Sequence, residues 1–304
     1  MELEEMEEML PTTQRKTIVD PAALVYLGIA VPKWGKTTFF CDVPDSLLIA
    51  FERGFQFQQT PTVFIDMWHD STGKFEPYKD DAGIIHTTMT LLKKVLVNSD
   101  KYKFLILDTA DMAAKKCTDY YLEKYRWQHV QDGGDYGRGY DIAQNTPFRQ
   151  MVGALMGTGR GMAFTTHQAV NSTDMKKGKK VLKETTLPGG IYKFLHTQAD
   201  VILHGSFGVR QKGNTYRDRI WQTEGDEETL AGNRARSLHL PQKYIVDPER
   251  PWAQWAEFFT NPELAQIAEE ELMGASSRRA RDLDADADEE ETPKPKLSTL
   301  KKKR

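Results

Sequence analysis

The stretch that decides the fold of this chain reads Ala30-Val31-Pro32-Lys33-Trp34-Gly35-Lys36-Thr37-Thr38. It follows the apolar run 24–27 and precedes two phenylalanines. A strand, a tight turn and a helix start in this order are typical of a loop that binds phosphate, because the backbone N–H groups of the turn and of the first helical turn point at the anion. We call residues 30–38 the phosphate loop and predict that all nine contact a nucleotide.

Three residues of the phosphate loop have separate chemical tasks. Gly35 lets the backbone approach the anion, Lys36 is expected to reach the β- and γ-phosphates, and the Thr37 hydroxyl is expected to ligate Mg²⁺. The strict pattern begins with glycine, whereas this chain has Ala30, which fits where its φ is negative. The alternative interpretation is an ordinary turn between a buried strand and a surface helix.

The composition of the chain indicates one large or two modest folded domains. Of its 304 residues, 39% are apolar and 10% are aromatic, which is enough for a core. Cys41 and Cys117 have no metal-ligand spacing and are too few for a framework of disulfides, as is typical of a reducing cytoplasm. No apolar run approaches the roughly 20 residues that cross a bilayer, and the acidic residues 1–8 differ from a secretory signal. We therefore expect a cytoplasmic protein without a membrane partner.

Apolar runs alternate with amphipathic stretches through most of the chain. The expected strands are residues 24–29, 46–51, 62–65, 104–108 and 162–167. One helix is expected to begin after residue 36, and two others are expected at about 82–97 and 146–158. This alternation predicts an α/β fold with a mainly parallel central sheet flanked by helices. Shorter strand-like pieces near the C-terminal part predict antiparallel additions at the sheet edge. They cover residues 199–207, 215–223 and 237–240.

Composition divides the chain into three parts. Residues 1–16 are acidic and then polar, so we expect a mobile arm, and residues 17–260 are expected to form one folded domain. Residues 261–304 are expected to form a helical extension and then a disordered tail, because seven acids in 282–291 are followed by six bases in 294–304. The tail either solubilises the protein or competes with DNA for its basic loops.

A short helix over residues 251–259 is expected to precede the extension. Its large apolar side chains recur at helical spacing and therefore share one face. These residues are Trp252, Trp255, Ala256 and Phe259. Because aromatic stripes at this spacing usually pack internally, docking on the core is favoured over contact with a partner chain.

Two carboxylates are expected beside the phosphate loop. Asp108 ends the most apolar strand, 71 residues after Thr37, at the edge where a parallel sheet presents ligand-binding groups. We expect it to complete the Mg²⁺ site. Glu52 follows another strand at the same edge and is the expected base that positions the attacking water, the alternative being a salt-bridged surface acid. These residues together predict a site for ATP and Mg²⁺.

Two further segments are expected to respond to the nucleotide and to bind single-stranded DNA. Gln168 ends a strand, where its amide can bond the γ-phosphate or the attacking water and report nucleotide state. The flexible loop 171–187 follows, and its lysines suit phosphate contact. They are Lys176, Lys177, Lys179, Lys180 and Lys183. A second flexible, glycine-rich stretch, 131–140, carries planar groups that can stack on unpaired bases. They are Tyr136, Arg138 and Tyr140. The alternative for both segments is a solvated loop.

Residues 20–248 resemble the RecA-like P-loop ATPases, and most closely the small, core-only phage members proposed to act in recombination and single-strand annealing. The phosphate loop is similar to theirs, Asp108 matches their Mg²⁺-site aspartate, and Glu52 falls where the family keeps its catalytic glutamate. His167 and Gln168 resemble the Asn-Gln pair that leads into the second DNA loop of the family.

The resemblance implies an activity, a location and partners. Family members hydrolyse ATP with Mg²⁺ between adjacent subunits and couple nucleotide state to single-stranded DNA. This implies a role in phage DNA recombination, annealing or repair, in the host cytoplasm if the source is a phage. Basic residues of a neighbouring subunit reach the γ-phosphate in this family, and Arg234 or Arg236 resembles them. A single-strand DNA-binding protein is a further implied partner.

Two other functions remain open at this point. A ring-forming replicative helicase or a helicase loader has the same core and would be distinguished by strand unwinding. A nucleotide-gated binding module would recruit a replication protein through its tails with little ATP hydrolysis. ATP turnover with and without single-stranded DNA separates this module from an ATPase.

Overall fold

The computed structural model describes most of the chain between residues 19 and 274. The described residues are 19–70, 72–171, 182–208, 217–226, 229, 231–234 and 240–274. The expected arm 1–16 and the charged tail therefore lie outside them, as do four of the five lysines predicted to bind DNA. Within the described residues, no helix is long and apolar enough to cross a membrane.

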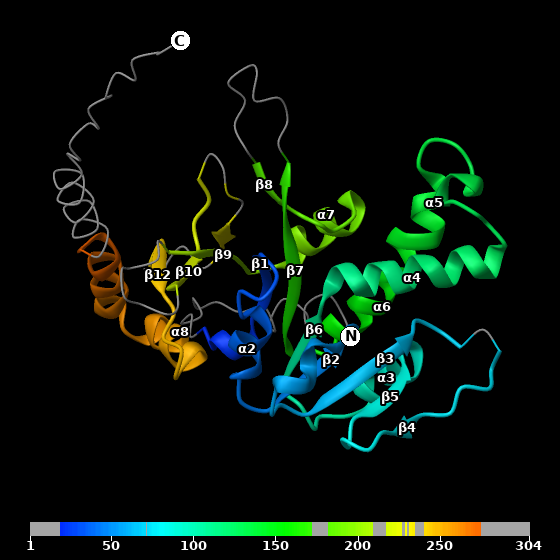
Figure 1. The fold of residues 1–304 in the computed structure, drawn as a ribbon, viewed down its shortest axis with the longest axis horizontal. Coiled ribbons are helices and arrows are strands. Elements are labelled where there is room, and N and C mark those ends of the chain that lie inside the picture. Colours follow the sequence, from blue (N-terminus) through cyan, green and yellow to red (C-terminus); the bar gives the residue numbers. More distant parts are fainter. Residues whose placement is uncertain are drawn as a thin grey trace, which may run out of the picture.

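A parallel sheet forms the centre of the molecule, as the sequence predicts (Figure 1). Its strands in spatial order are β9 (Val201–Phe207), β1 (Val25–Ala30), β7 (Gly161–Asn171), β6 (Phe104–Asp108), β2 (Ser46–Ala50), β3 (Thr62–Met67) and β5 (Ile85–Thr88). Every neighbouring pair in this series runs parallel. The carboxyl ends of these strands therefore meet at one edge, which is where a parallel sheet binds its ligands.

Antiparallel strands extend this centre, and β10 confirms the predicted antiparallel addition over 215–223. The predicted direction of strand 199–207 is wrong, because β9 pairs parallel with β1 and so belongs to the central sheet. β10 and β12 follow β9 at one side, β4 closes the other side, and β11 and β8 pair with β9 and β7. Their bounds are β4 (Tyr78–Lys79), β8 (Leu182–Thr185), β10 (Arg219–Gln222), β11 (Gly232–Asn233) and β12 (Lys243–Ile245). The predicted strand 237–240 falls mostly outside the described residues, and the sequence analysis did not anticipate β12.

Helices cover both faces of the sheet. One face carries α3 (Met89–Val97), α4 (Ala110–Tyr125), α6 (Thr146–Met156) and α7 (Gly189–Gln198). The other carries α2 (Lys36–Cys41), α8 (Pro251–Thr260) and a helix over 262–274. The shorter helical segments are η1 (Pro21–Ala23), η2 (Arg53–Phe57), η3 (Val130–Gly133), α5 (Arg138–Tyr140) and η4 (Asp141–Asn145).

Burial on both faces explains why the central strands are apolar throughout. Side chains alternate between the faces of a strand, so Leu27 and Ile29 pack under α3, α4, α6 and α7, while Tyr26 and Ala30 pack under α2 and α8. The predicted docking of α8 is confirmed, because Trp255 is fully buried and donates its indole N–H to the Tyr26 hydroxyl at 3.3 Å. The sheet and α8 thus form one continuous core.

The predicted helix 82–97 is wrong in its first half. Residues Ile85–Thr88 form β5, which pairs with β3, and α3 begins at Met89. The Thr88 side chain caps the helix by accepting a hydrogen bond from the Leu91 N–H at 3.2 Å. A strand and a capped helix in direct succession share the apolar spacing of one longer helix.

The glycine-rich stretch 131–140 is also not the flexible loop that the sequence predicts. It forms η3 and α5, which pack on one another beyond the end of α4 (Figure 1). The glycines permit this close packing, because an added Cβ on Gly139 would collide with the Val130 carbonyl and one on Gly133 with Trp127. Their role here is compactness rather than mobility.

Candidate functional site

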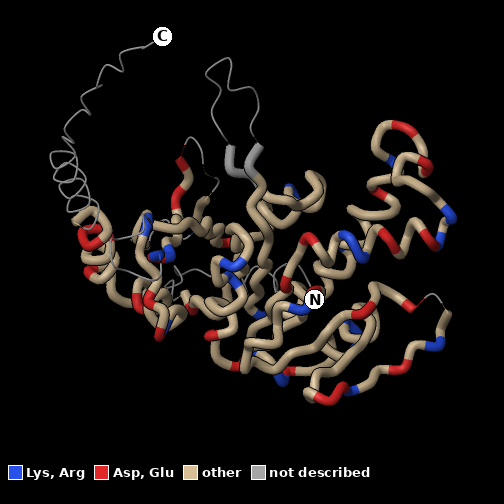
Figure 2. The backbone as a smooth tube through the Cα atoms, viewed as in Figure 1, with Lys and Arg blue, Asp and Glu red and all other residues tan. Residues whose placement is uncertain are grey.

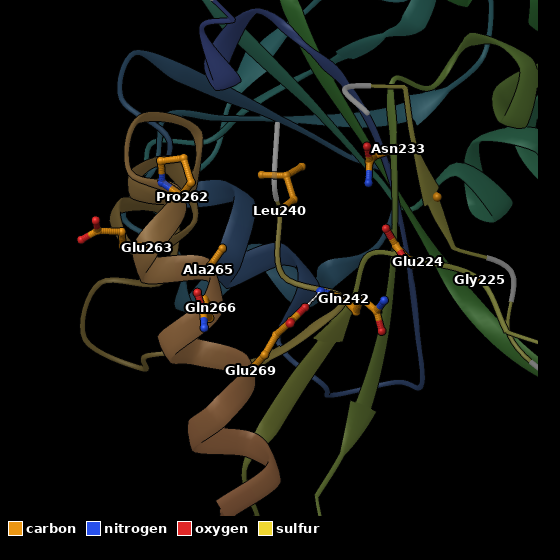
Figure 3. A pocket seen from close by; sticks show the side chains of 11 residues that line it. Glu224, Gly225, Asn233, Leu240, Gln242, Pro262, Glu263, Ala265, Gln266 and Glu269 are labelled. Carbon is orange, nitrogen blue, oxygen red and sulfur yellow. Dashed lines mark hydrogen bonds between the residues drawn. The ribbon is translucent and has the colours of Figure 1, made fainter. Parts of the chain in front are cut away.

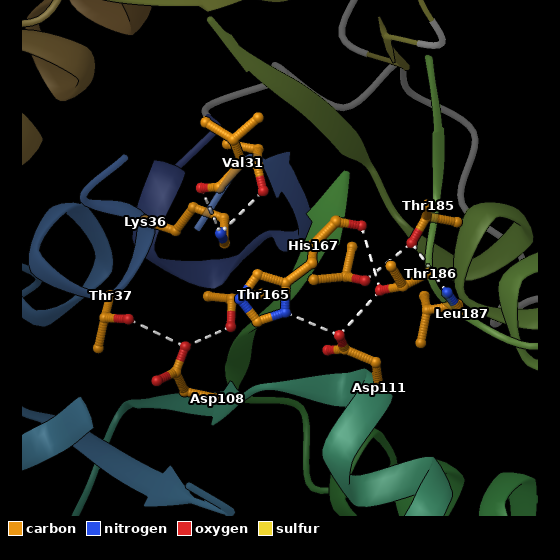
Figure 4. Close-up of polar contacts among 12 residues, drawn as sticks. Val31, Lys36, Thr37, Asp108, Asp111, Thr165, His167, Thr185, Thr186 and Leu187 are labelled. Carbon is orange, nitrogen blue, oxygen red and sulfur yellow. Dashed lines mark hydrogen bonds and ion pairs between the residues drawn. The ribbon is translucent and has the colours of Figure 1, made fainter. Parts of the chain in front are cut away.

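The strands place the predicted site residues at one edge of the sheet. Ala30, the last residue of β1, lies opposite His167 of β7, and Ala50 of β2 lies opposite Asp108 of β6. Because β7 separates β1 from β6, the side chain of Asp108 reaches across the end of β7 to the phosphate loop (Figure 4). The residues that the sequence analysis assigned to nucleotide and metal are therefore brought together.

The phosphate loop folds as a tight turn into α2. Gly35 has a φ of 106°, in the left-handed region, and Lys33 also has a positive φ of 63°. The Trp34 N–H donates to the Val31 carbonyl at 3.3 Å, which closes the turn. The side chain of Trp34 is buried, so this residue can offer a nucleotide only its backbone. Ala30 is likewise buried at the end of β1.

Lys36 is buried inside the phosphate loop. Its ammonium group donates to the carbonyls of Ala30 at 2.9 Å and Val31 at 3.2 Å. Burial lowers the pKa of Lys36, although the nearby carboxylate of Asp108 opposes this shift. The amine lies at the centre of the loop, where it can turn from carbonyl oxygens to phosphate oxygens without moving the backbone.

Thr37, in the first turn of α2, contacts Asp108 at the end of β6. The Thr37 hydroxyl donates to Asp108 Oδ1 at 3.0 Å, and the Thr165 hydroxyl donates to the same oxygen. Burial raises the pKa of Asp108, so its charged form lacks solvation. A divalent cation would favour that charged form, and hydroxyl and carboxylate oxygens are ligands that Mg²⁺ prefers. These residues therefore fit Mg²⁺.

The remaining ligands of such a cation would come from outside the protein. Among the described residues, no group of three or more His, Cys, Asp or Glu side chains could hold a metal ion by itself. Mg²⁺ usually keeps several waters and binds through one or two carboxylates and substrate phosphates. The donor set at Thr37 and Asp108 agrees with that pattern.

A second polar cluster, which the sequence analysis did not predict, connects β7 with α4 and β8. Asp111 Oδ2 lies 2.8 Å from His167 Nδ1, and it accepts a hydrogen bond from the Thr186 hydroxyl at 2.8 Å (Figure 4). The Thr166 and Thr185 hydroxyls lie 2.8 Å apart beside it. Asp111 lies in the first turn of α4, three residues after Asp108, and this closeness in sequence to a predicted site residue is the signal that could have identified it.

The pKa values of this cluster favour an ion pair. The hydrogen bond that His167 donates to Asp111 raises the pKa of His167, and burial opposes this shift. Burial raises the pKa of Asp111, but the hydrogen bonds from His167 and its neighbours outweigh this effect and leave that pKa below its ordinary value. Both shifts favour the charged forms, so a protonated His167 faces an ionised Asp111 over an extended pH range.

We expect His167→Gln to lower the free energy of unfolding most at mildly acid pH. A histidine whose pKa is raised by folding stabilises the fold fully at pH values below its pKa in the unfolded chain, and this stabilisation is lost as the pH rises through its pKa in the folded protein. An aspartate whose pKa is lowered by folding stabilises the fold at pH values above its pKa in the unfolded chain, and this stabilisation is lost at lower pH. The loss of unfolding free energy in His167→Gln is therefore largest between about pH 4 and pH 6.5 and shrinks above that window. Urea unfolding over a pH series measures it.

His196→Gln is the matched control for this prediction, because His196 is exposed on α7. Its free energy of unfolding should stay close to that of the parent protein over the whole series. A deficit in His167→Gln that does not vary with pH would contradict the ion pair.

Glu52 and Gln168 lie at the same edge of the sheet. Glu52 is two residues beyond Ala50, the partner of Asp108, and its charge acts on both Lys36 and His167. Gln168 continues β7 and pairs with Thr185 of β8. Their positions match those expected for a water-orienting carboxylate and a sensor of nucleotide state, and those roles stay predictions.

Arg234 lies away from the phosphate loop of its own chain. Its backbone N–H donates to the Asp200 carbonyl at 2.8 Å, and its guanidinium lies 3.7 Å from the Asp200 carboxylate. Asp200 directly precedes β9 and is therefore at the opposite edge of the sheet. Arg236 lies outside the described residues. A role of Arg234 at a neighbouring subunit stays a prediction.

Arg219, which the sequence analysis did not select, lies against the phosphate loop. An added Cβ on Gly35 would come within 2.8 Å of the Arg219 guanidinium. Arg219 begins β10, two strands from β1, and is exposed. This arginine adds positive charge to the place where phosphate is expected.

The residues predicted to bind DNA are only partly described. Lys176, Lys177, Lys179 and Lys180 lie outside the described residues. Lys183 belongs to β8, which corrects part of the predicted flexible loop 171–187, because Leu182–Thr185 pair with β7. Tyr136 is fully exposed, and Arg138 and Tyr140 are exposed in α5. Figure 2 shows acidic and basic residues interleaved along α4, so the approach to α5 has mixed charge.

A pocket of about 810 Å³ lies elsewhere, between the β10–β12 side of the sheet and the helix 262–274 (Figure 3). Its lining includes Glu224, Gln242 and Glu269, and no residue of the phosphate loop. The Gln242 N–H donates to the Glu269 carboxylate, which ties the helix to the sheet. This pocket is separate from the predicted nucleotide site.

Three features together define a RecA-like P-loop ATPase. They are a phosphate loop with a buried lysine, a threonine that contacts an aspartate on β6, and a parallel sheet in which β7 lies between β1 and β6. Residues 22–235 match the family described as the AAA domain, and the chain belongs to that family.

A curated prophage protein and a solved structure are among the proteins similar to this chain. It is 27% identical over 158 residues to the SPbeta prophage-derived uncharacterized protein YorG of Bacillus subtilis (strain 168), a match that covers 51% of this chain and 46% of the relative. The chain thus spans less than half the length of that curated relative. The crystal structure of the KaiC-like protein PH0186 from Pyrococcus horikoshii OT3 aligns with a TM-score of 0.37 and 14% identity, over 75% of this chain and 87% of that protein.

Proposed function

We propose that the protein hydrolyses ATP in the presence of Mg²⁺ and couples nucleotide state to single-stranded DNA binding, in phage DNA recombination, annealing or repair. The observation that carries the nucleotide part is the 3.0 Å contact between the Thr37 hydroxyl and the buried Asp108, beside the buried Lys36. The prophage-derived relative supports a phage setting, with action in the host cytoplasm.

The residues of the site divide the work of phosphoryl transfer among them. Lys36 turns from the loop carbonyls to the phosphate oxygens and offsets their charge, and Thr37 and Asp108 hold the metal. When bound, Mg²⁺ would supply positive charge that offsets the negative charge developing on the phosphates during cleavage. Glu52 orients the attacking water, and Gln168 relays the state of the γ-phosphate along β7.

The route from the nucleotide to DNA is proposed to run through the β7–β8 hairpin. Asp111 contacts both His167 on β7 and Thr186, which directly follows β8, so both strands are tied to α4 beside the site. The lysine-rich loop connects these two strands. A change in the position of Gln168 or His167 would therefore act on the β7–β8 pair, whose two strands flank the lysine-rich segment in the sequence.

The ATP site is proposed to lie between adjacent subunits, with Arg234 or Arg236 reaching the γ-phosphate of a neighbour. A single-strand DNA-binding protein is a further proposed partner. We expect Arg234→Gln to lower ATP turnover by about a thousandfold or more in assembled protein, as for an arginine that acts in trans. Mixing Arg234→Gln with Lys36→Ala protein should restore part of the turnover, because some interfaces then combine intact halves. Turnover that is unchanged in Arg234→Gln would remove this arginine from the site.

ATP turnover measured with and without single-stranded DNA tests the proposed function. We expect turnover to rise when DNA is added, because bound DNA is proposed to favour the state of the site that hydrolyses ATP. Turnover without any stimulation would contradict the coupling to DNA. Unwinding of a duplex would favour the helicase alternative, and tight ATP binding without turnover would favour the nucleotide-gated module.

Neutralising the lysine-rich loop should weaken DNA binding without changing ATP binding. We expect replacement of Lys176, Lys177, Lys179 and Lys180 by glutamine to reduce the slope of log affinity against log salt by about 3, because each phosphate contact on single strands contributes roughly 0.7. Fluorescence anisotropy with a labelled oligonucleotide at several salt concentrations measures this slope.

The control is the neutralisation of four other lysines, which lie away from the β7–β8 hairpin, and it should leave the slope unchanged. These lysines are Lys93, Lys94, Lys101 and Lys103. A slope that falls equally in both variants would indicate general electrostatic attraction instead of contact by the loop.

A further inference from the structure

The tryptophan within the phosphate loop is held by an edge of the sheet that lies far away in the sequence. Trp34 is 1% exposed, and its indole N–H donates to the carbonyl of Ser206 in β9 at 2.7 Å. Its ring packs on Trp221 of β10, with ring centroids 4.0 Å apart. One loop side chain thus contacts two strands beyond β1.

The backbone of β9 makes room for this ring. Gly205 lies opposite Ala30 of β1, and an added Cβ on Gly205 would lie 2.7 Å from the Trp34 indole and from the Ala30 side chain. Trp221 lies opposite Gly205 on the other side. A side chain larger than hydrogen at residue 205 would therefore force the ring, and the loop attached to it, out of position.

The same strand, β10, also carries the arginine that lies against the loop. Arg219 precedes Trp221 by two residues, so both side chains lie on the same face of the strand. Trp221 packs under the loop against Trp34 and against Phe39 of α2, at 5.4 Å between ring centroids, while Arg219 lies beside Gly35. β10 thus contacts the phosphate loop at two points.

We propose that Trp34 is a positioning residue for nucleotide binding, which fixes the phosphate loop to β9 and β10 through Ser206 and Trp221 and thereby keeps Arg219 in register with Gly35. The inference rests on the proposed binding of ATP at this loop. A phosphate loop gains affinity when its N–H groups are held in place before the ligand arrives. Trp34 supplies that order from a side chain that never touches the nucleotide.

A change at Trp34 is therefore expected to act on affinity as well as on stability. We expect Trp34→Phe, which removes the indole N–H and part of the ring contact, to raise the dissociation constant for ATP by about three- to tenfold. Trp221→Phe keeps the hydrogen bond to Ser206 and loses only part of the ring contact, so we expect a smaller rise. Calorimetric titration of the full chain with ATP and Mg²⁺ measures both constants.

The coupling between Trp34 and Arg219 is a readout that a purely structural role would not move. If Trp34 keeps Arg219 in register with Gly35, the effects of Trp34→Phe and Arg219→Gln on the dissociation constant should be less than additive. Trp127→Phe is the matched control and should leave the constant unchanged, because Trp127 lies beyond the far end of α4. Thermal unfolding without ligand records any loss of stability separately.

The outcomes separate this inference from the proposed function. An unchanged dissociation constant in Trp34→Phe, or effects of Trp34→Phe and Arg219→Gln that simply add, would overturn the role of Trp34. If that variant does not fold, an unchanged constant in Trp221→Phe overturns it equally. A parent protein that binds no ATP in the calorimeter overturns the proposed function itself, and the inference with it.

Discussion

Replacing Glu52 by glutamine is expected to lower ATP turnover by about 10²- to 10⁴-fold, the usual contribution of a positioned base. Glutamine keeps the size of the side chain and its ability to bond water but cannot accept a proton. ATP binding should stay within a factor of about three, since the charge removed is not one that holds the phosphates. A steady-state phosphate-release assay and an ATP titration together measure the two effects.

The position of Glu52 gives this prediction its strength. The parallel pairing of Ala50 with Asp108 places the end of β2 beside the predicted metal site, and the charge of Glu52 already acts on Lys36. Glu249→Gln is the matched control, because Glu249 is exposed before α8 and remote from this edge. Unchanged turnover in Glu52→Gln would place the base elsewhere.

The edge of the sheet that holds the site could be predicted from the sequence because its signals are local. Apolar runs end at Ala30, Ala50 and Asp108, and a parallel sheet brings such ends together whatever lies between them. The short cluster of glycine, lysine and threonine then marks which strand end receives phosphate. Each of these inferences needs only a few neighbouring residues.

The contacts that hold the loop in place could not be predicted in this way. Trp34 depends on the register between β1 and β9, which brings Gly205 next to Ala30 across 175 residues of chain. Arg219 reaches Gly35 only because β10 folds back on β9. Sequence spacing carries no information about this register. Nothing in the sequence therefore indicated that Trp34 packs on β9 and β10 or that Arg219 lies beside Gly35.

Two predictions of local structure failed because one pattern fits two structures. The apolar residues between Ile85 and Leu96 match a helical period, yet Thr88 ends a strand and caps a shorter helix. Glycines over 131–140 suggest mobility, yet Gly133 and Gly139 serve a close approach of η3 to α5. Tertiary pairing decides such cases, and a single sequence does not contain it.

Replacing Lys36 by alanine is expected to weaken ATP binding by about a hundredfold or more, because it removes the charged donor buried within the loop. Lys94→Ala is the matched control, since Lys94 is exposed on α3 and lies outside the phosphate loop. Calorimetric titration with ATP and Mg²⁺ should show near-normal affinity for Lys94→Ala.

The same change is expected to abolish the stabilisation of the fold by ATP and Mg²⁺, because a ligand raises the free energy of unfolding only through its binding to the folded protein. Adding ATP and Mg²⁺ should therefore raise the thermal midpoint of the parent protein and not that of Lys36→Ala. A midpoint that rises equally in both proteins would place the nucleotide away from this lysine.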